Sequence, residues 1–353
     1  MKLLPTRIEV IYPRARGQDI GLRGSLPPLS WEKSLPPERV SKDASLFTVP
    51  IPEGEILELK VSRGEDWQLG LNYLVHAGEH LHLEPAFDQR TTRLEEGLDV
   101  EGLRVDVLLP VGYDEHPEET YSVVYAVDGQ SLWSHSQDSF GTWNLDTTLT
   151  SLAHVGATED VILVGVHTAQ DRLTLLSPVP DGTHGGGGGP AFLERLIGRV
   201  KPFIEKRYRT KQGPEHTGVL GSSMGGVFAF WAAWSRPDVF GKAACLSSSF
   251  FWGNRWLVRM VKETKTPSPR PLIYLDSGAT PNEGEQKSRD NYHHTRSMLN
   301  ALTSLGFEAG KDLHRLVFPG HEHNAGSWAS RIALPMQLLF PRVPKPFDEA
   351  RWR

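Results

Sequence analysis

Hydrophobic residues in the first 90 positions follow the two-residue period of β-strands. In the segment Ile56–Val61 (ILELKV), apolar side chains fall at alternate positions from Leu57 onward, which is typical of a strand with one buried face. Similar apolar stretches, including RIEVIYP, SLFTVPIPEG and LNYLVHAGEHLHLEP, are separated by Pro and Gly turns. Short strands between turn signals favour a β-sandwich. We therefore predict a small all-β sandwich domain over residues 1–92.

Beyond about residue 101, short apolar strands alternate with longer helical stretches. The predicted strands are LRVDVLLP, YSVVYAVD, DVILVGVH, HTGVLG, AACLSS, PLIYLDSG and HRLVFPG. The predicted helices are LDTTLTSLAHV, PAFLERLIGRVKPFIEKRY, GGVFAFWAAWSR and RDNYHHTRSMLNALTSLG. Strands that alternate with helices indicate a mostly parallel sheet with helices on both faces. We predict an α/β domain over residues 93–345, a linker at 85–100, and a mobile loop at the five glycines 185–189.

Composition and charge exclude several classes of function. The 353 residues include 38 Lys+Arg and 43 Asp+Glu, for a formal net charge of −5, which is a poor electrostatic match for nucleic acid or an anionic membrane. The single cysteine, Cys245, excludes an internal disulfide and a multi-cysteine zinc site. No apolar run approaches the ~18 residues of a spanning helix, and the first residues lack the apolar core of a signal peptide. We expect a cytoplasmic protein.

A candidate catalytic serine lies between a predicted strand and a predicted helix. Gly221-Ser222-Ser223-Met224-Gly225 fits the pattern G-x-S-x-G. A sharp strand-to-helix turn presents the central serine at the carboxyl edge of the sheet and needs small residues on both sides. Ser223 is the predicted nucleophile, and the N–H of Met224 is a predicted oxyanion donor. The alternatives are a Gly/Ser helix cap or a phosphate-binding turn, although the Lys of a P-loop is absent.

A serine nucleophile needs a base, and the base needs an orienting acid. In this arrangement the acid follows a later strand, and a histidine follows the strand after that. The candidate acids after the strand at 272–275 are Asp276, Glu283 and Glu285. Glu283 ranks first because it lies within a loop that can reach a neighbouring loop, and Asp276 and Asp290 are the fallbacks.

Two histidines qualify as the base. His321 and His323 both follow the predicted strand at 314–318. A His-x-His pair also suggests a metal site, but zinc needs a third and a fourth ligand, and the 14 histidines of the chain are scattered. We therefore expect no metal.

At these residues the chain resembles the α/β-hydrolase esterase family that includes enterochelin esterases, feruloyl esterases, esterase D and the mycolyltransferases. The resemblance covers about residues 100–342 through YSVVYAVDGQSLW, FGTWNLDTTL, VILVGVHTAQDR, GSSMGG and HNAGSW. HNAGSW resembles the family's H-N-E-x-x-W, in which the histidine is the base and a tryptophan lies five residues on. The resemblance thus implies His323, paired with Trp328. The family's acid follows a strand as G-T-x-D/E, and Glu283 in GATPNE matches it only through a gap.

The same resemblance implies further site residues. The second oxyanion donor would be the backbone N–H of Gln130, in the turn after Asp128, and Asp128 itself would brace that turn. Aromatic residues near strand ends are candidates for lining an acyl or aryl pocket, or for ordinary packing; they are Trp133, Trp143, Phe250, Phe251 and Trp252.

The N-terminal domain resembles a starch-binding type carbohydrate module. GLRGSLPPLSW and LELKVSRGEDWQLGLN carry the resemblance and place Trp31, Trp67 and Asn72 on the matching positions. Their rings would stack on sugar faces, whereas tryptophan in a small sandwich is often core. Enterochelin esterases also carry an N-terminal β-sandwich.

The sequence therefore predicts a serine carboxyl-ester hydrolase that needs no metal and no organic cofactor and acts on a small-molecule ester. Siderophore (enterochelin-like) esters are the first candidate substrates. A feruloyl or acetyl sugar ester and an acyltransferase reaction are the alternatives within the fold. The alternative outside catalysis is a glycan-binding protein with an inactive hydrolase domain.

Overall fold

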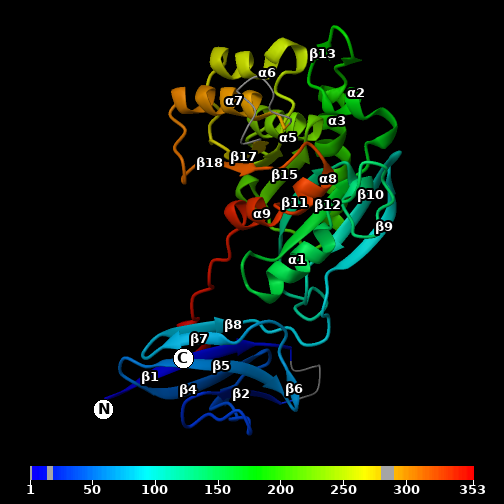
Figure 1. Ribbon diagram of the computed structural model, residues 1–353. Helices are drawn as coiled ribbons and strands as arrows, with labels where there is room; N and C mark the ends of the chain where they lie inside the picture. Colours follow the sequence, from blue (N-terminus) through cyan, green and yellow to red (C-terminus); the bar gives the residue numbers. More distant parts are fainter. Residues whose placement is uncertain (1, 14–18, 280–289) are drawn as a thin grey trace.

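The N-terminal part of the chain forms two β-sheets with a shared core (Figure 1). The computed structural model describes residues 2–13, 19–279 and 290–353. One sheet has the order β3-β4-β1-β8; in the other, β2, β5 and β6 are adjacent and β7 also pairs with β5. The strands are β1 (Leu3–Ile11), β2 (Ile20–Gly24), β3 (Arg39–Val40), β4 (Ala44–Pro52), β5 (Ile56–Arg63), β6 (Asp66–Trp67), β7 (Tyr73–His76) and β8 (His80–Leu83). Their alternating apolar residues fill the space between the sheets, as the period-two pattern predicts.

The second part is built on one eight-stranded sheet with the order β18-β17-β16-β15-β11-β12-β10-β9. The six strands from β12 to β18 along this order are parallel, and β10 runs antiparallel to both its neighbours. The strands are β9 (Arg93–Val100), β10 (Leu103–Leu109), β11 (Ser122–Val127), β12 (Val161–Val166), β15 (Thr217–Ser222), β16 (Lys242–Leu246), β17 (Leu272–Ala279) and β18 (Leu313–Pro319). Every strand expected between residues 103 and 320 is present.

Helices cover both faces of this sheet, as Figure 1 shows. One hydrophobic cluster joins the sheet to α3 through α7, and another joins it to α1, α8 and α9. The α-helices are α1 (Leu145–His154), α2 (Arg172–Leu176), α3 (Gly189–Arg195), α4 (Lys201–Arg207), α5 (Met224–Ser235), α6 (Trp252–Glu263), α7 (Tyr292–Ser304), α8 (Ala325–Ala329) and α9 (Ala333–Leu339). A π-helical turn, η4 (Leu196–Val200), joins α3 to α4; the 3-10 turns are η2 (Gly129–Ser131), η3 (Ala169–Asp171), η5 (Pro214–His216) and η6 (Glu349–Trp352). In the described part of the chain, no helix has the length and apolarity to cross a bilayer.

Two expectations about connecting segments are wrong. The second half of the predicted linker is strand β9, which pairs with β10 from Arg93 to Val100. The glycine tract is not a mobile loop: β14 (Gly185–Gly186) pairs with β13 (Pro180–Asp181), and Gly189 begins α3. A Cβ on Gly186 would lie 2.3 Å from Ser177 Oγ, so these glycines permit close packing that a larger residue would prevent.

The last residues of the described chain return to the N-terminal sandwich, as the red thread in Figure 1 shows. Trp352 is buried against Ala44 and Leu46 of β4, and its Nε1 donates to Glu9 Oε2 at 3.0 Å. Arg7 forms an ion pair with Glu349 at 2.7 Å. The segment 341–353, which we call the C-terminal tail, therefore connects the α/β part back to the first strand of the chain.

Candidate active site

Ser223 lies at the sharp turn between β15 and α5. Its backbone has φ 55° and ψ −118°, a conformation that costs a non-glycine residue about 1–3 kcal/mol and is found mainly at functional sites. A Cβ on Gly221 would lie 2.4 Å from the backbone of Gly225. The strand and the helix therefore cross too closely for a side chain at position 221, which explains the small residue there. Met224 is the first residue of α5, so its N–H belongs to the amides for which a helix has no internal acceptor.

Two further side chains complete a line of hydrogen bonds from Ser223. His323 Nε2 lies 2.9 Å from Ser223 Oγ, and His323 Nδ1 lies 2.9 Å from Asp290 Oδ1. His323 follows β18, and the side chain of Asn324 caps the short helix α8 behind it by accepting from Ser327 N. Trp328, five residues after His323, packs edge-on against the imidazole with ring centroids 5.1 Å apart. The structure thus brings together the predicted nucleophile and the predicted base.

Among the described residues, the carboxylate beside His323 is Asp290, one of the two fallbacks. Glu283 and Glu285 lie outside the described residues. Asp276 is completely buried within β17, where it accepts from Tyr274 Oη and Ser247 N. It therefore braces the middle of the sheet. The sequence contains no spacing signal for Asp290, because its position depends on its contacts with Ser247, Gly278 and Arg331.

The charge of Asp290 is stabilised by its neighbours. Burial alone would raise the pKa of Asp290, but the hydrogen bonds from His323, Gly278 and Ser247 and the charge of Arg331 outweigh it and hold the pKa below its usual range. A carboxylate in this state accepts the Nδ1–H of histidine and leaves Nε2 free to accept a proton.

An ion pair holds the turn that carries Gln130, the second predicted oxyanion donor. Gln130 lies in η2, directly after Asp128, whose φ of 61° is left-handed. Arg172 donates to both carboxylate oxygens of Asp128 at 2.8 Å, and Thr168 Oγ1 donates to one of them at 2.6 Å. A Cβ on Gly129 would lie 2.8 Å from the ring of His167. Asp128 thus braces the turn, as expected.

The aromatic residues proposed for a pocket divide into two groups. Trp133 and Trp143 are buried in the core, where Trp133 Nε1 donates to Asp106 at 2.9 Å and Trp143 packs against Trp328. Phe250 and Trp252 are also buried. These four have the packing role that was the alternative reading. Phe251 alone is exposed, at 43%, beside the ring of His294.

The three residues proposed to bind a glycan lie in the N-terminal sandwich. Trp31 and Trp67 are 38% and 39% exposed, with ring centroids 6.2 Å apart and planes inclined by 46°. The guanidinium of Arg23 lies over the ring of Trp67 at 4.7 Å. Asn72 Nδ2 donates to Glu58 at 2.7 Å. The two rings form an exposed aromatic pair, whereas the Asn72 amide already has a partner within the sandwich.

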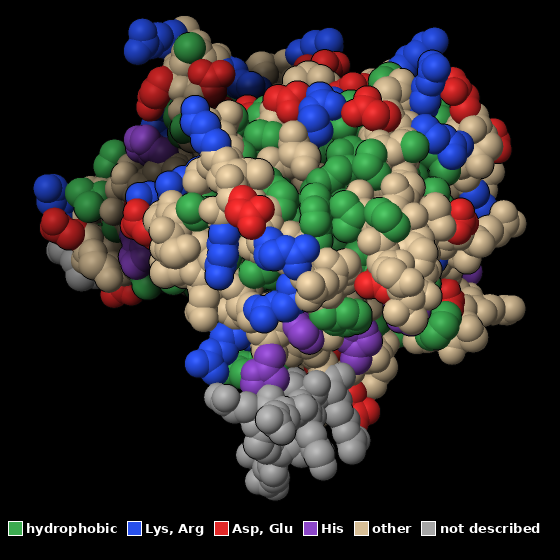
Figure 2. All heavy atoms as spheres, turned by 90° about the horizontal axis from the view of Figure 1, so that it is seen from above, with side chains coloured by type: hydrophobic (Ala, Val, Ile, Leu, Met, Phe, Trp, Pro, Cys, Tyr) green, Lys and Arg blue, Asp and Glu red, His purple; other side chains and the backbone are tan. Residues whose placement is uncertain are grey.

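A row of cations, which the sequence pattern did not indicate, lies on α6. Ser249 Oγ is 3.1 Å from Ser223 Oγ, and α6 begins three residues later. Arg255, Arg259 and Lys262 are exposed on α6 and line an open hollow of about 380 Å³ with Asn254 and Val258. No carboxylate among the described residues pairs with any of the three. Figure 2 shows Lys, Arg and His side chains on this upper face of the molecule.

The backbone at the start of α6 is strained. Gly253, Asn254 and Arg255 have φ values of 56°, 53° and 61°, so three consecutive residues adopt the left-handed conformation, which side chains disfavour. Strain of this kind is concentrated at functional sites. The helices expected from the sequence include neither α6 nor its cations.

The chain is similar to several proteins described as esterases. Residues 101–336 match the family model described as "Putative esterase". The siderophore enterobactin esterase of Emericella nidulans is 25% identical over 195 residues, which cover 50% of this chain and 64% of that protein. The endo-1,4-beta-xylanase/feruloyl esterase of Xylanibacter ruminicola is 26% identical over 240 residues, which cover 67% of this chain and 29% of that protein. The chain thus spans less than two thirds of the length of both relatives.

Solved structures share the fold. The ferric enterobactin esterase of Salmonella typhimurium superposes with a TM-score of 0.54 at 14% identity, covering 91% of this chain and 88% of that one. At this level of identity the likeness concerns the arrangement of helices and strands alone.

Proposed function

The chain belongs to this esterase family, and from that premise we propose that it is a serine carboxyl-ester hydrolase that works through an acyl-enzyme. The observation that carries the proposal is the line Ser223–His323–Asp290, with 2.9 Å at each step and the serine on a strained strand-to-helix turn. These contacts are those that a serine needs to lose its proton to a histidine of fixed orientation.

In the proposed reaction, Ser223 Oγ attacks the ester carbonyl carbon while His323 Nε2 takes the hydroxyl proton. The backbone N–H groups of Met224 and Gln130 stabilise the oxyanion. His323 then gives the proton to the alkoxide as the ester C–O bond breaks. Water attacks the acyl carbon while His323 takes its proton; the bond from that carbon to Ser223 Oγ then breaks, Oγ regains a proton from His323, and the carboxylic acid leaves. Asp290 holds the imidazole in the required tautomer throughout.

The proposal is tested with purified protein on short-chain and aryl p-nitrophenyl esters. Ser223→Ala is expected to lower kcat by about 10⁴-fold or more, because no other group forms the acyl-enzyme. Ser151→Ala is the matched control, since Ser151 Oγ only donates to a carbonyl of its own helix and this variant should retain wild-type rates. A fluorophosphonate probe should label wild type and not Ser223→Ala. A folded wild-type protein that hydrolyses no ester and takes no label contradicts the proposal.

For the substrate, we propose an anionic ester such as a metal-bound catecholate siderophore. The supporting observation is the row of cations on α6, Arg255, Arg259 and Lys262, none of which pairs with a carboxylate of the described residues. The helix begins three residues after Ser249, whose Oγ lies 3.1 Å from Ser223 Oγ. Unpaired cations next to a cleft attract anionic ligands and raise their association rate. A neutral feruloyl or acetyl sugar ester would make no use of them.

This preference for an anionic ester is tested by comparing KM for an anionic and a neutral substrate. The double variant Arg255→Gln/Lys262→Gln is expected to raise KM for the ferric catecholate ester about tenfold, since each lost ion pair weakens binding, and to leave KM for a neutral p-nitrophenyl ester unchanged. Raising the salt concentration should reproduce the effect in wild type. Equal changes for the neutral and anionic esters would remove the argument for an anionic substrate.

A second candidate function concerns the exposed pair Trp31 and Trp67. Two accessible tryptophan rings can stack on sugar faces, which supports a glycan-binding role for the sandwich and, with it, a sugar-linked ester. Titration with gluco-oligosaccharides should quench tryptophan fluorescence in wild type and not in Trp67→Ala. An unchanged spectrum in wild type would contradict this role and leave the ester hydrolysis untouched.

A further inference from the structure

Asp290 accepts more hydrogen bonds than a protonated carboxyl could. Oδ1 faces His323 Nδ1, while Oδ2 accepts from Ser247 Oγ at 2.8 Å, from Arg331 Nη2 at 3.1 Å and from the N–H of Gly278. A carboxylate has about four acceptor sites, and four donors face this one, three of them at Oδ2. A proton on Oδ2 would have to displace one of those three donors.

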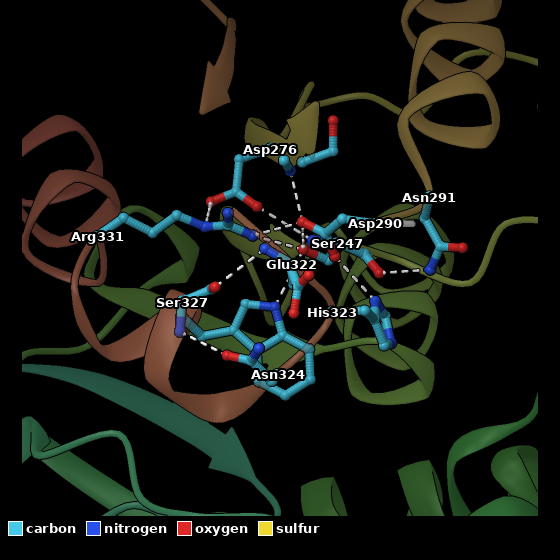
Figure 3. A network of polar contacts seen from close by, with 12 residues as sticks. Ser247, Asp276, Asp290, Asn291, Glu322, His323, Asn324, Ser327 and Arg331 are labelled. Atoms are coloured by element: carbon cyan, nitrogen blue, oxygen red, sulfur yellow. Dashed lines mark hydrogen bonds and ion pairs between the residues drawn. The ribbon is translucent and has the colours of Figure 1, made fainter. Parts of the chain in front are cut away.

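The direction of the Ser247 hydrogen bond is fixed by two other donors. Figure 3 shows one of them, Arg331, together with Ser247 and Asp290. Trp328 Nε1 donates to Ser247 Oγ at 3.0 Å, and Arg331 Nη2 donates to the same oxygen. Both neighbours are donors only. The hydroxyl proton of Ser247 therefore points to Asp290 Oδ2, and Arg331 contacts Asp290 both directly and through Ser247.

Arg331 connects two buried carboxylates. Its side chain is 1% exposed, Asp290 is also 1% exposed, and Asp276 is completely buried. Arg331 Nε lies 3.1 Å from Asp276 Oδ2, and the guanidinium lies 5.0 Å from the ring of Phe318. Without its positive charge, two carboxylates would share a dry site, where like charges cannot both ionise.

We propose that Arg331 is a positioning residue of this active site, which acts directly and through Ser247 to keep Asp290 ionised and its Oδ1 directed at His323. The inference rests on the proposed hydrolase reaction. Asp276 belongs to the same network. It contacts Arg331 Nε and holds Ser247 in place by accepting from its N–H at 3.0 Å. Arg331 lies three residues beyond the motif HNAGSW that begins at His323, so the motif gives no sign of its role.

Other charged groups that face this cluster come from the adjoining strands. Asp276 interacts with Tyr274 and Arg331, with Asp290, and at longer range with Cys245 and Arg315. Burial raises the pKa of Asp276 to about 6, despite the opposing effect of Arg331. Asp276 is thus the member of the pair that gains a proton first on acidification, while Asp290 remains charged.

The experiment compares the pH dependence of kcat/KM in four proteins. In Arg331→Met the acid limb should move to higher pH by about one unit or more, because the loss of a buried cation beside the hydrogen-bonded pair Asp290–His323 favours uptake of a proton by that pair. Arg331→Lys should restore part of the shift, since it keeps the charge. Asp276→Asn should move the acid limb to lower pH or leave it unchanged, because this substitution removes a negative neighbour of Asp290. At neutral pH, Arg331→Met should lose between about tenfold and the roughly 10⁴-fold that follows removal of the acid's charge from a serine triad.

The double variant Arg331→Met/Asp276→Asn covers the case in which Arg331→Met does not fold. It removes one buried cation and one buried anion together, so the net charge of the cluster is unchanged, and its acid limb should still lie above that of Asp276→Asn alone. Arg342→Met is the control for lost stability: Arg342 pairs with Asp160 at 2.9 Å away from this cluster, so it should lower Tm without moving the limb.

Identical acid limbs in the double variant and in Asp276→Asn would overturn the proposal and reduce Arg331 to a structural residue. The proton NMR signal of His323 Nδ1–H gives a readout that needs no turnover. It should persist to lower pH in wild type than in Arg331→Met. If wild type hydrolyses no ester, the proposed function fails, while this signal still decides whether Arg331 holds Asp290 ionised.

Discussion

At the scale of single residues, the acid of the site is the part that the sequence could not identify. Ser223 and His323 follow from local patterns, because a strand-to-helix turn and a histidine after the last strand have recognisable spacing. Asp290 has no such pattern. Its place beside His323 is set by Gly278, Ser247 and Arg331, which are far apart in the chain and come together only in the folded sheet.

A comparison of three acids tests this assignment. Asp290→Asn should lower kcat by about 10⁴-fold, because the amide stabilises the wrong tautomer of the histidine. Glu283→Gln should keep wild-type activity, since Asp290 already fills the position beside His323. Asp276→Asn should retain most activity at pH 7. Steady-state kinetics on one p-nitrophenyl ester measures all three, and a large loss in Glu283→Gln alone would reverse the assignment.

At the scale of elements, strand and helix periodicity located the sheet and most helices, while connecting segments were misread. The glycine tract illustrates the reason. Composition alone suggests flexibility, but Gly186 and Gly187 have φ values of 91° and 92°, and Gly187 N donates to Ser177 Oγ at 2.7 Å. The same lack of side chains that permits disorder also permits a tightly packed turn, and only tertiary contacts decide between them.

Alanine substitution distinguishes a packed turn from a loose one. Gly186→Ala should lower the free energy of unfolding by about 2–4 kcal/mol, from the left-handed backbone and the clash with Ser177. Gly182→Ala is the matched control, because no atom lies within 4 Å of its added Cβ and its φ is not positive. Urea denaturation measures both. Equal midpoints for the two variants would mean that the tract is loose in solution.

At the scale of the whole molecule, the C-terminal tail binds the sandwich through a cluster of titratable groups. Glu9 is completely buried and accepts from Asp348 N at 2.6 Å and from Trp352 Nε1. His82 lies between Glu9 and Glu84, at 2.9 and 3.0 Å. Lys345 of the tail pairs with Glu84 at 2.6 Å. The tail is therefore held partly by charge and partly by burial of Trp352.

This cluster predicts how the stability of the tail contact depends on pH. Burial opposes protonation of His82, but Glu84 and Glu9 outweigh it and raise the pKa of His82 above 6.5. The stabilisation of the tail contact by protonated His82 is complete below pH 6.5 and is lost as the pH rises through the raised pKa of His82. Despite burial, His82 and Lys345 lower the pKa of Glu84 from 4.5 to about 2, so its contribution is lost as the pH falls from 4.5 toward 2. The contact should be strongest between about pH 4.5 and 6.5.

Limited proteolysis of the tail measures this dependence. Cleavage within 341–353 should be slowest in that window and faster at pH 8. In His82→Gln the difference between pH 6 and pH 8 should disappear, because the titrating group is gone. A tail that is cleaved at the same rate from pH 5 to pH 8 in wild type would contradict the expectation.

The tail also sets an order of events during synthesis. The strands of the sandwich leave the ribosome first, but the side chain that covers β4, Trp352, is made after the whole α/β part. At about 5–20 residues per second this interval is on the order of tens of seconds. During that time Ala44 and Leu46 remain uncovered on the nascent chain, and the α/β part can fold before the sandwich acquires its final contact. The sandwich is thus translated before the α/β part and completed after it.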